Sequence, residues 1–178
     1  EAYRLYSAAQ PADHLGLAFI RRQEARLSMD AGKPSEALSL IREAKNGFRR
    51  AHEYRALAHA RIDQGWAHVY LRALGVAKEC GLDAQQQLEQ IGDRSGLNRV
   101  WRLLGWCLIE QDKHDEAIVE FDKVIVCARD IGDEDEESEG LIGMAWAYFR
   151  AGRMKETQKI LDISEPLMRT KWLSLEGL

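Results

Sequence analysis

A 40-residue repeat is the feature of this sequence that most restricts its fold. Three tryptophans are 40 residues apart, and a small residue precedes each of them. The corresponding triplets are Gly65-Trp66-Ala67, Gly105-Trp106-Cys107 and Ala145-Trp146-Ala147. The same period links Ile91-Gly92-Asp93 to Ile131-Gly132-Asp133, and Ala37, Ala77 and Ala117 to Thr157. A period of this length is typical of solenoids, in which each repeat buries its apolar face against the next repeat.

Apolar spacing within the period predicts an amphipathic helix in the second half of each repeat. In residues 37–51 the apolar side chains follow an i, i+4, i+7, i+11, i+14 pattern, and residues 117–131 repeat this pattern. Residues 77–91 repeat it more weakly, because Gly81 stands where the other two stretches carry a large apolar side chain. We expect the helix around Gly81 to pack loosely or to bend.

Turn signals separate these helices from a first helix in each repeat. Gly32 and Pro34 are typical of a helix end followed by the first turn of the next helix. We expect first helices at about 13–31, 54–72, 94–112 and 135–152, and second helices at about 35–51, 75–91, 115–131 and 155–170. Residues 1–10 would then end an earlier second helix, and residues 172–178 would begin a further repeat.

Composition supports an all-helical chain and excludes several kinds of partner. Only three prolines occur, and no run alternates as a β-strand would. The net charge of −4 argues against direct nucleic-acid binding, and no apolar run is long enough to span a membrane. The three cysteines, Cys80, Cys107 and Cys127, are scattered and odd in number, which favours reduced thiols and a cytoplasmic location. Because the chain begins with Glu1 rather than Met, we expect an excised piece of a longer protein.

The third repeat resembles the tetratricopeptide repeat (TPR). It carries the order W-x2-L-G-x2-Y…A-x3-F, with Leu108 in place of the tyrosine, and the matching residues are Trp101, Leu104, Gly105, Leu108, Ala117 and Phe121. The fourth repeat follows the same frame with Leu141, Met144, Ala145, Tyr148 and Leu161, although Thr157 replaces the alanine. The first two repeats keep the small residues Ala25, Ala37, Gly65 and Ala77 but lack the leading tryptophan and leucine.

The resemblance implies an all-α fold, a right-handed superhelical solenoid of antiparallel helix pairs. The whole chain, 1–178, would be a single TPR-like domain with units at about 13–52, 53–92, 93–132 and 133–171 and partial units at both ends. A 40-residue period is longer than the standard 34 and resembles the extended-helix subtype of signalling adaptors and bacterial regulator sensor domains. In this family the first helices line a concave groove, and the fold implies no chemistry.

The TPR frame places Trp66, Trp106 and Trp146 in that groove, because each follows the small residue of a first helix. Aromatic side chains are favoured at binding hot spots, so the three rings would form one binding row, with Tyr70 one turn beyond Trp66. The alternative is that each tryptophan packs against its neighbours and fills the groove floor.

Five arginines on the predicted first helices would also face the groove. These candidates are Arg22, Arg26, Arg99, Arg102 and Arg150. A guanidinium can stack on an indole and bind a carboxylate at the same time. The alternative is a set of solvated surface arginines.

No catalytic or metal-binding pattern accompanies these groove candidates. The five histidines lack HExxH or Cys/His spacing, and no phosphate-binding loop or nucleophile motif occurs. The acidic run 133–137 is typical of a helix start rather than a calcium loop. We therefore expect no enzyme activity, no cofactor and a protein or peptide ligand in the groove. The alternatives are a ligand- or domain-sensing segment of a larger regulator, bacterial transcriptional regulators included, and self-association through the open ends of the solenoid.

Overall fold

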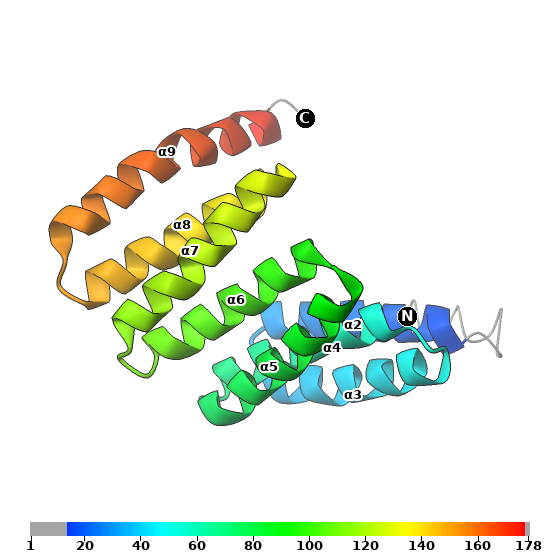
Figure 1. The fold of residues 1–178 in the computed structure, drawn as a ribbon. Coiled ribbons are helices and arrows are strands. Elements are labelled where there is room, and N and C mark those ends of the chain that lie inside the picture. The colour runs from blue at the N-terminus through cyan, green and yellow to red at the C-terminus, as the bar shows by residue number, and fades with distance from the viewer. Residues whose placement is uncertain (1–13, 177–178) are drawn as a thin grey trace. The chain divides into compact units, whose positions relative to one another are not determined.

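The computed structural model describes residues 14–176, with side chains described up to Leu167, and this part of the chain is entirely helical apart from short turns (Figure 1). The helices are α2 (His14–Asp30), α3 (Pro34–Arg50), α4 (Tyr54–Tyr70), α5 (Leu74–Ile91), α6 (Arg94–Ile109), α7 (His114–Ile131), α8 (Glu134–Arg150) and α9 (Met154–Glu176). No strand occurs among the described residues. The predicted all-α fold class is confirmed. The expected tail of an earlier helix in residues 1–10 lies outside the described residues.

The 40-residue period governs both the helices and the turns. The first helices α2, α4, α6 and α8 begin at residues 14, 54, 94 and 134, and the second helices begin at 34, 74, 114 and 154. Left-handed backbone conformations follow the same period and are found at Gly32, Arg72, Asp112 and Gly152 and, in the other turn, at His52, Gly92 and Gly132. Each turn therefore needs one residue with positive φ, and glycine supplies it in four of these seven places.

The described helices group into two compact units, and the division falls between Gly92 and Asp93. This point coincides with the predicted boundary between the second and third repeats. Unit 1 holds α2 to α5 and unit 2 holds α6 to α9, so each unit contains two helix pairs.

In unit 1 the second helix α3 packs its apolar stripe against the first helices. Phe48 is fully buried and lies in one cluster with Ala18 of α2 and Leu57 of α4. The Phe19 ring of α2 meets the Phe48 ring edge-on at 4.9 Å. A second cluster joins Ile41 of α3 to Ala25 and Ala67, the small residues of the two first helices, together with Ala37. Small residues in the first helices thus let the second helix approach closely.

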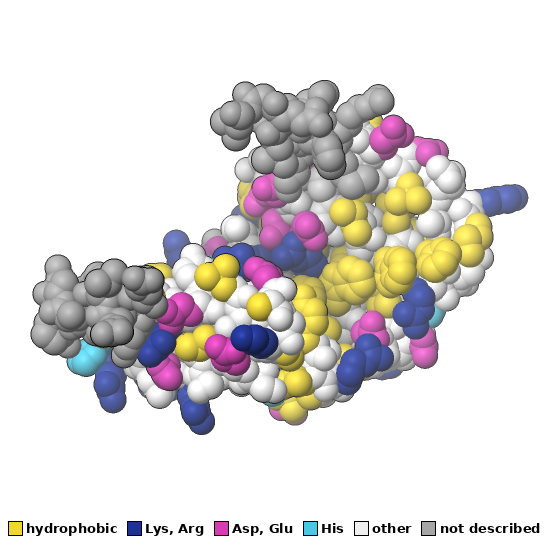
Figure 2. Space-filling model, turned by 180° about the vertical axis from the view of Figure 1, so that it is seen from behind, with side chains coloured by type: hydrophobic (Ala, Val, Ile, Leu, Met, Phe, Trp, Pro, Cys, Tyr) yellow, Lys and Arg dark blue, Asp and Glu magenta, His cyan; other side chains and the backbone are white. Residues whose placement is uncertain are grey.

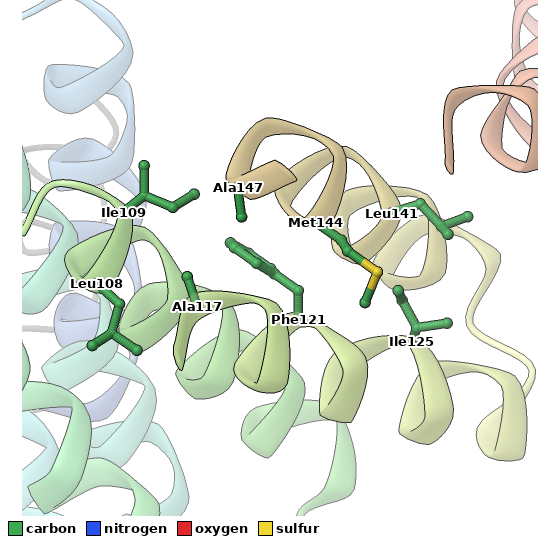
Figure 3. Packing of buried hydrophobic residues seen from close by; sticks show 8 residues of the cluster. All are labelled: Leu108, Ile109, Ala117, Phe121, Ile125, Leu141, Met144 and Ala147. Carbon is green, nitrogen blue, oxygen red and sulfur yellow. The ribbon is translucent and has the colours of Figure 1, made fainter. Parts of the chain in front are cut away.

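In unit 2 the ring of Phe121 on α7 occupies the centre of the core (Figure 3). The ring reaches from α7 toward α8, where Met144 and Ala147 lie beside it. Two glycines make room for it, since a Cβ atom at Gly105 of α6 or at Gly143 of α8 would lie too close to the ring. The ring of Phe121 therefore requires a residue without a side chain at the consensus small position Gly105.

Two sequence expectations differ from the structure. The fifth position of each apolar stripe is not buried: Ile91 and Ile131 are exposed, because they end their helices next to a left-handed glycine. The last second helix does not stop at 170, and residues 172–176 continue α9 rather than beginning a new repeat. Between Met154 and Glu176 no glycine occurs, and the helix accommodates Pro166, so no local signal ends it.

Candidate binding face

The first helix α8 carries an apolar stripe on its exposed side. Ile142, Trp146 and Phe149 are 38%, 43% and 46% exposed, and their spacing of i, i+4 and i+7 places them on one side of the helix. The Trp146 and Phe149 rings lie 5.5 Å apart between centroids, at an interplanar angle of 32°. The space-filling view shows hydrophobic side chains reaching the surface between charged ones (Figure 2). The apolar residues of α8 that face the core, such as Leu141 and Met144, lie on its opposite side.

The neighbouring first helix α6 contributes Arg102 and Trp106, which are four residues apart and share one side of that helix. The Arg102 guanidinium binds Glu139 of α8 at 3.2 Å and Glu136 at 3.6 Å, so this side of α6 lies next to α8. Trp106 is partly buried, and its ring meets Phe121 edge-on at 6.0 Å. We define the α6–α8 face as Arg102, Trp106, Glu139, Ile142, Trp146 and Phe149.

A cluster of compensated charges marks one end of this face. Burial raises the pKa of the Glu136 carboxyl, and the positive charges of Arg102 and Arg99 oppose that rise. Glu136 is positioned by the helix start, because Asp133 at the N-cap of α8 accepts a hydrogen bond from the Glu136 backbone amide at 3.0 Å. Since Arg102 is already neutralised by two carboxylates, the face offers mainly apolar and aromatic surface to a ligand.

The remaining candidates of unit 2 are also held by neighbouring groups. Arg150, at the end of α8, binds Asp112 in the turn between α6 and α7 at 3.1 Å. Arg99 on α6 is half-buried and acts electrostatically on Glu136. These arginines are therefore not a separate cationic row in the structure.

In unit 1 the candidate arginines divide into one buried ion pair and one exposed side chain. Arg22 of α2 donates to Asp63 of α4 at 2.6 Å, and the Asp63 side chain is only 2% exposed. Arg22 stands 80 residues before Arg102, so in each unit the same repeat position ties one first helix to the next. Arg26, one turn further along α2, is exposed. The sequence predicted a groove role for Arg22 because nothing near it in the chain reveals its acidic partner, which lies 41 residues away on α4. For Arg26 the groove role stays a prediction.

Aromatic candidates of unit 1 lie on α4. Trp66 is partly buried, whereas Tyr70 is 61% exposed. Trp66 belongs to unit 1 and the other two tryptophans belong to unit 2. A single row of three rings across both units therefore stays a prediction.

Sequence reasoning missed Ile142, Phe149 and Glu139 as members of the α6–α8 face. The signal was available in residues 142–149, where apolar residues recur on two opposite sides of the helix. An amphipathic helix needs only one apolar side for its core, so the second apolar side indicates a contact beyond the helix pair.

No group of three or more potential metal ligands gathers among the described residues, and no helix in that part of the chain could cross a membrane. The candidate site thus consists of apolar surface and ion pairs.

Comparisons with known proteins reveal the fold but no close relative. No family model matches the chain, and no curated protein matches it. Among solved structures, the chain is similar to aspartyl phosphate phosphatase F from Bacillus subtilis, with a TM-score of 0.80 and 11% identity over 89% of this chain and 42% of that one. The chain thus spans less than half of the phosphatase.

This chain matches larger shares of two further solved structures. BtubC (BKLC) from P. vanneervenii gives a TM-score of 0.76 at 16% identity, covering 95% of this chain and 71% of that one. A putative kinesin light chain from Podosopora anserina, with nearly identical TPR-like repeats, gives 0.68 at 14% identity, covering 96% and 83%. Such low identities establish the fold alone. The chain therefore has the fold of the TPR-like helical-repeat proteins.

Proposed function

We propose that this chain is a non-catalytic scaffold that binds a peptide or a segment of a partner protein along its first helices. The observation that carries the proposal is the exposed stripe Ile142, Trp146 and Phe149 beside Trp106 on the α6–α8 face. Clusters of exposed aromatic and aliphatic side chains are typical of binding surfaces, because their burial releases water from apolar area. We also propose that the first helices α2 and α4 of unit 1 carry ligand contacts of their own, at Arg26, Trp66 and Tyr70.

The chemistry of the face suggests the kind of ligand. The two neighbouring rings of Trp146 and Phe149, together with Ile142, favour a segment with large apolar side chains. At one end of the face, Arg102 and Glu139 can exchange part of their mutual ion pair for polar groups of the ligand. The TPR-like fold of the three solved structures supports a scaffold role in general terms. The 40-residue period agrees with the extended subtype found in signalling adaptors and regulator sensor domains, and a cytoplasmic location fits the same proposal.

One observation favours the second candidate, a sensing segment of a larger regulator. The phosphatase with the same fold is more than twice as long as the stretch that this chain matches. In that case the α6–α8 face would bind a neighbouring domain or a small effector rather than a separate protein.

Selection from a random peptide library displayed on phage tests the scaffold proposal. The wild-type chain should enrich peptides with large apolar side chains, and Trp146→Ala should weaken their binding by about 2 kcal/mol or more. Because the Trp146 ring is 43% exposed and packs on Phe149, the melting temperature of this variant should change little. Trp106→Ala should lower both affinity and stability, since its ring also packs on Phe121.

The control is Tyr54→Ala, which removes another exposed aromatic side chain from a first helix in unit 1. Selected peptides should bind this variant as they bind the wild type. Peptides that bind Trp146→Ala equally well would show that the α6–α8 face is not the binding surface.

A further inference from the structure

A polar groove of about 600 Å³ lies in unit 1, between α3 and α4. Its α3 side carries Arg42, Lys45 and Arg49, which recur at i, i+3 and i+7 and share one side of that helix. Its α4 side carries Gln64 and His68, again on one side of the helix. None of the described residues that line this groove carries a carboxylate.

The cations of the groove lack acidic partners. Within the described part of the chain, neither these α3 cations nor Arg61, one turn before Gln64 on α4, forms an ion pair. By contrast, Arg21 and Arg22 of the same unit are both paired. The Lys45 ammonium donates to the side-chain oxygen of Gln64, which is a neutral acceptor. The contact with this neutral amide gives the partly buried lysine a hydrogen bond but no opposite charge in place of the water that it has lost.

Electrostatics agrees with an uncompensated positive site. Burial lowers the pKa of the Lys45 ammonium, and Arg61 and Arg49 lower it further, although the Cys80 thiol and Asp83 on α5 oppose them. Burial also lowers the pKa of the His68 imidazole, and the positive charge of Lys45 adds to this effect. An anion in the groove would oppose both shifts, because it favours the protonated forms.

Comparison of the two units shows that the fold itself does not require these polar residues. Eighty residues further along the chain, the same repeat positions hold apolar residues: Ile125 corresponds to Lys45, Leu141 to Arg61, Met144 to Gln64 and Tyr148 to His68. In unit 2 these four residues form or flank the hydrophobic core. At these positions unit 1 carries polar and charged side chains, whereas the equivalent helices α7 and α8 of unit 2 carry apolar side chains that pack in the core. Apolar side chains there would stabilise the fold more, so folding alone does not explain the polar residues of unit 1.

We propose that the α3–α4 groove binds the phosphoryl group of a ligand, with Lys45 and Arg42 or Arg49 as its charged contacts. Arginine forks match phosphate oxygens in pairs, and a lysine adds a point charge, so several unpaired cations suit a group of charge close to −2 better than a single carboxylate. The groove is larger than a phosphate ion, so the rest of the ligand would lie along α3. A phosphorylated metabolite and a phosphorylated side chain of a protein share this chemistry. The groove belongs to unit 1, so the inference does not depend on the α6–α8 face.

Titration of the complete 178-residue chain followed by NMR of the His68 ring tests the proposal. The probes are inorganic phosphate, a short phosphoserine peptide, its unphosphorylated form and acetate. Phosphate or the phosphopeptide should shift the His68 signals saturably, raise the pKa of His68 and bind more weakly as salt increases. Inorganic phosphate binding as tightly as the phosphopeptide would identify a small metabolite as the ligand class, and a much tighter phosphopeptide would identify a modified protein.

Variants at Lys45 decide whether the groove is responsible. Lys45→Ile introduces the residue that unit 2 carries at this position, and Lys45→Gln removes the charge with little change in length. Each should weaken phosphate binding by about tenfold without loss of thermal stability. Lys78→Gln is the matched control on the exposed side of α5 and should bind within about twofold of the wild type.

Three results would overturn the proposal. The first is the absence of any saturable shift with phosphate or phosphopeptide at millimolar concentration. The second is equal binding by acetate, which would show that the groove does not recognise a phosphoryl group. The third is unchanged phosphate affinity in a folded Lys45 variant.

Discussion

Replacement of Gly143 by alanine isolates the contact that organises unit 2. Gly143 of α8 faces the buried ring of Phe121 on α7, and a Cβ atom added there would lie 2.5 Å from the ring atoms Cδ1 and Cζ and closer still to Cε1. The ring has no room to withdraw, because a Cβ at Gly105 on α6 would already be 2.8 Å from its Cζ. We expect Gly143→Ala to force the two first helices apart or the ring out of its rotamer.

Two opposing effects set the magnitude. Alanine is favoured over glycine in a helix interior by about 1 kcal/mol, which would stabilise the variant. Overpacking of a well-filled core costs about 1–3 kcal/mol, and a clash with a fully buried ring belongs at the upper end. The net loss in the free energy of unfolding should therefore be about 2 kcal/mol.

Urea unfolding followed by far-UV circular dichroism and tryptophan fluorescence measures this loss. Trp106 reports on the site directly, because its ring contacts Phe121. In a Phe121→Leu background the clash is relieved, so Gly143→Ala should become neutral or stabilising, with a coupling energy of about 1.5 kcal/mol or more. Gly75→Ala is the control: a Cβ there meets nothing within 4 Å, so this change should not destabilise the chain.

A different outcome would refute the packing argument. If Gly143→Ala raises the free energy of unfolding by about 1 kcal/mol, as an open helical position would, then Phe121 does not depend on the small residues of the first helices.

Three further predictions concern the turns, the buried ion pair and the weakest stripe. His52 has a φ of 57°, so His52→Gly should raise the melting temperature by relieving about 1 kcal/mol of strain, and a lower melting temperature would contradict this. Arg22→Ala should destabilise the chain by about 3 kcal/mol, because its acidic partner on α4 is buried. Arg26→Ala, at an exposed position on the same helix, should change stability by less than about 0.5 kcal/mol, and equal losses in chemical denaturation would refute the assignment. Amide hydrogen exchange should be faster in α5 than in α7, because α5 has the buried Gly81 where α7 has the buried ring of Phe121. Equal or slower exchange in α5 would show that it packs as firmly as α7.

The sequence alone determined the fold class and most of the helix boundaries. Helix starts and ends depend on signals within a few residues, such as Pro34 at the start of α3 and Gly132 after α7, and such signals are readable without a structure. The TPR order also singled out Gly105 and Phe121, and the structure shows that the ring of Phe121 lies against Gly105. The period failed at the end of α9, where the repeat length suggested a boundary but no local signal supported one.

Only the tertiary structure decided which side chains are available to a ligand. The sequence predicted Arg22 and Arg102 as groove residues. In the structure each forms ion pairs with acids on the neighbouring first helix, 34 to 41 residues away in the sequence. The cations Arg42, Lys45 and Arg49 belong to no recognisable motif in the sequence, yet in the folded chain they line a groove to which the described residues contribute no acid. Spacing along one helix specifies which side chains share a face, whereas the charge and exposure of that face depend on what the neighbouring helices bring to it, and no local pattern in the sequence contains that information.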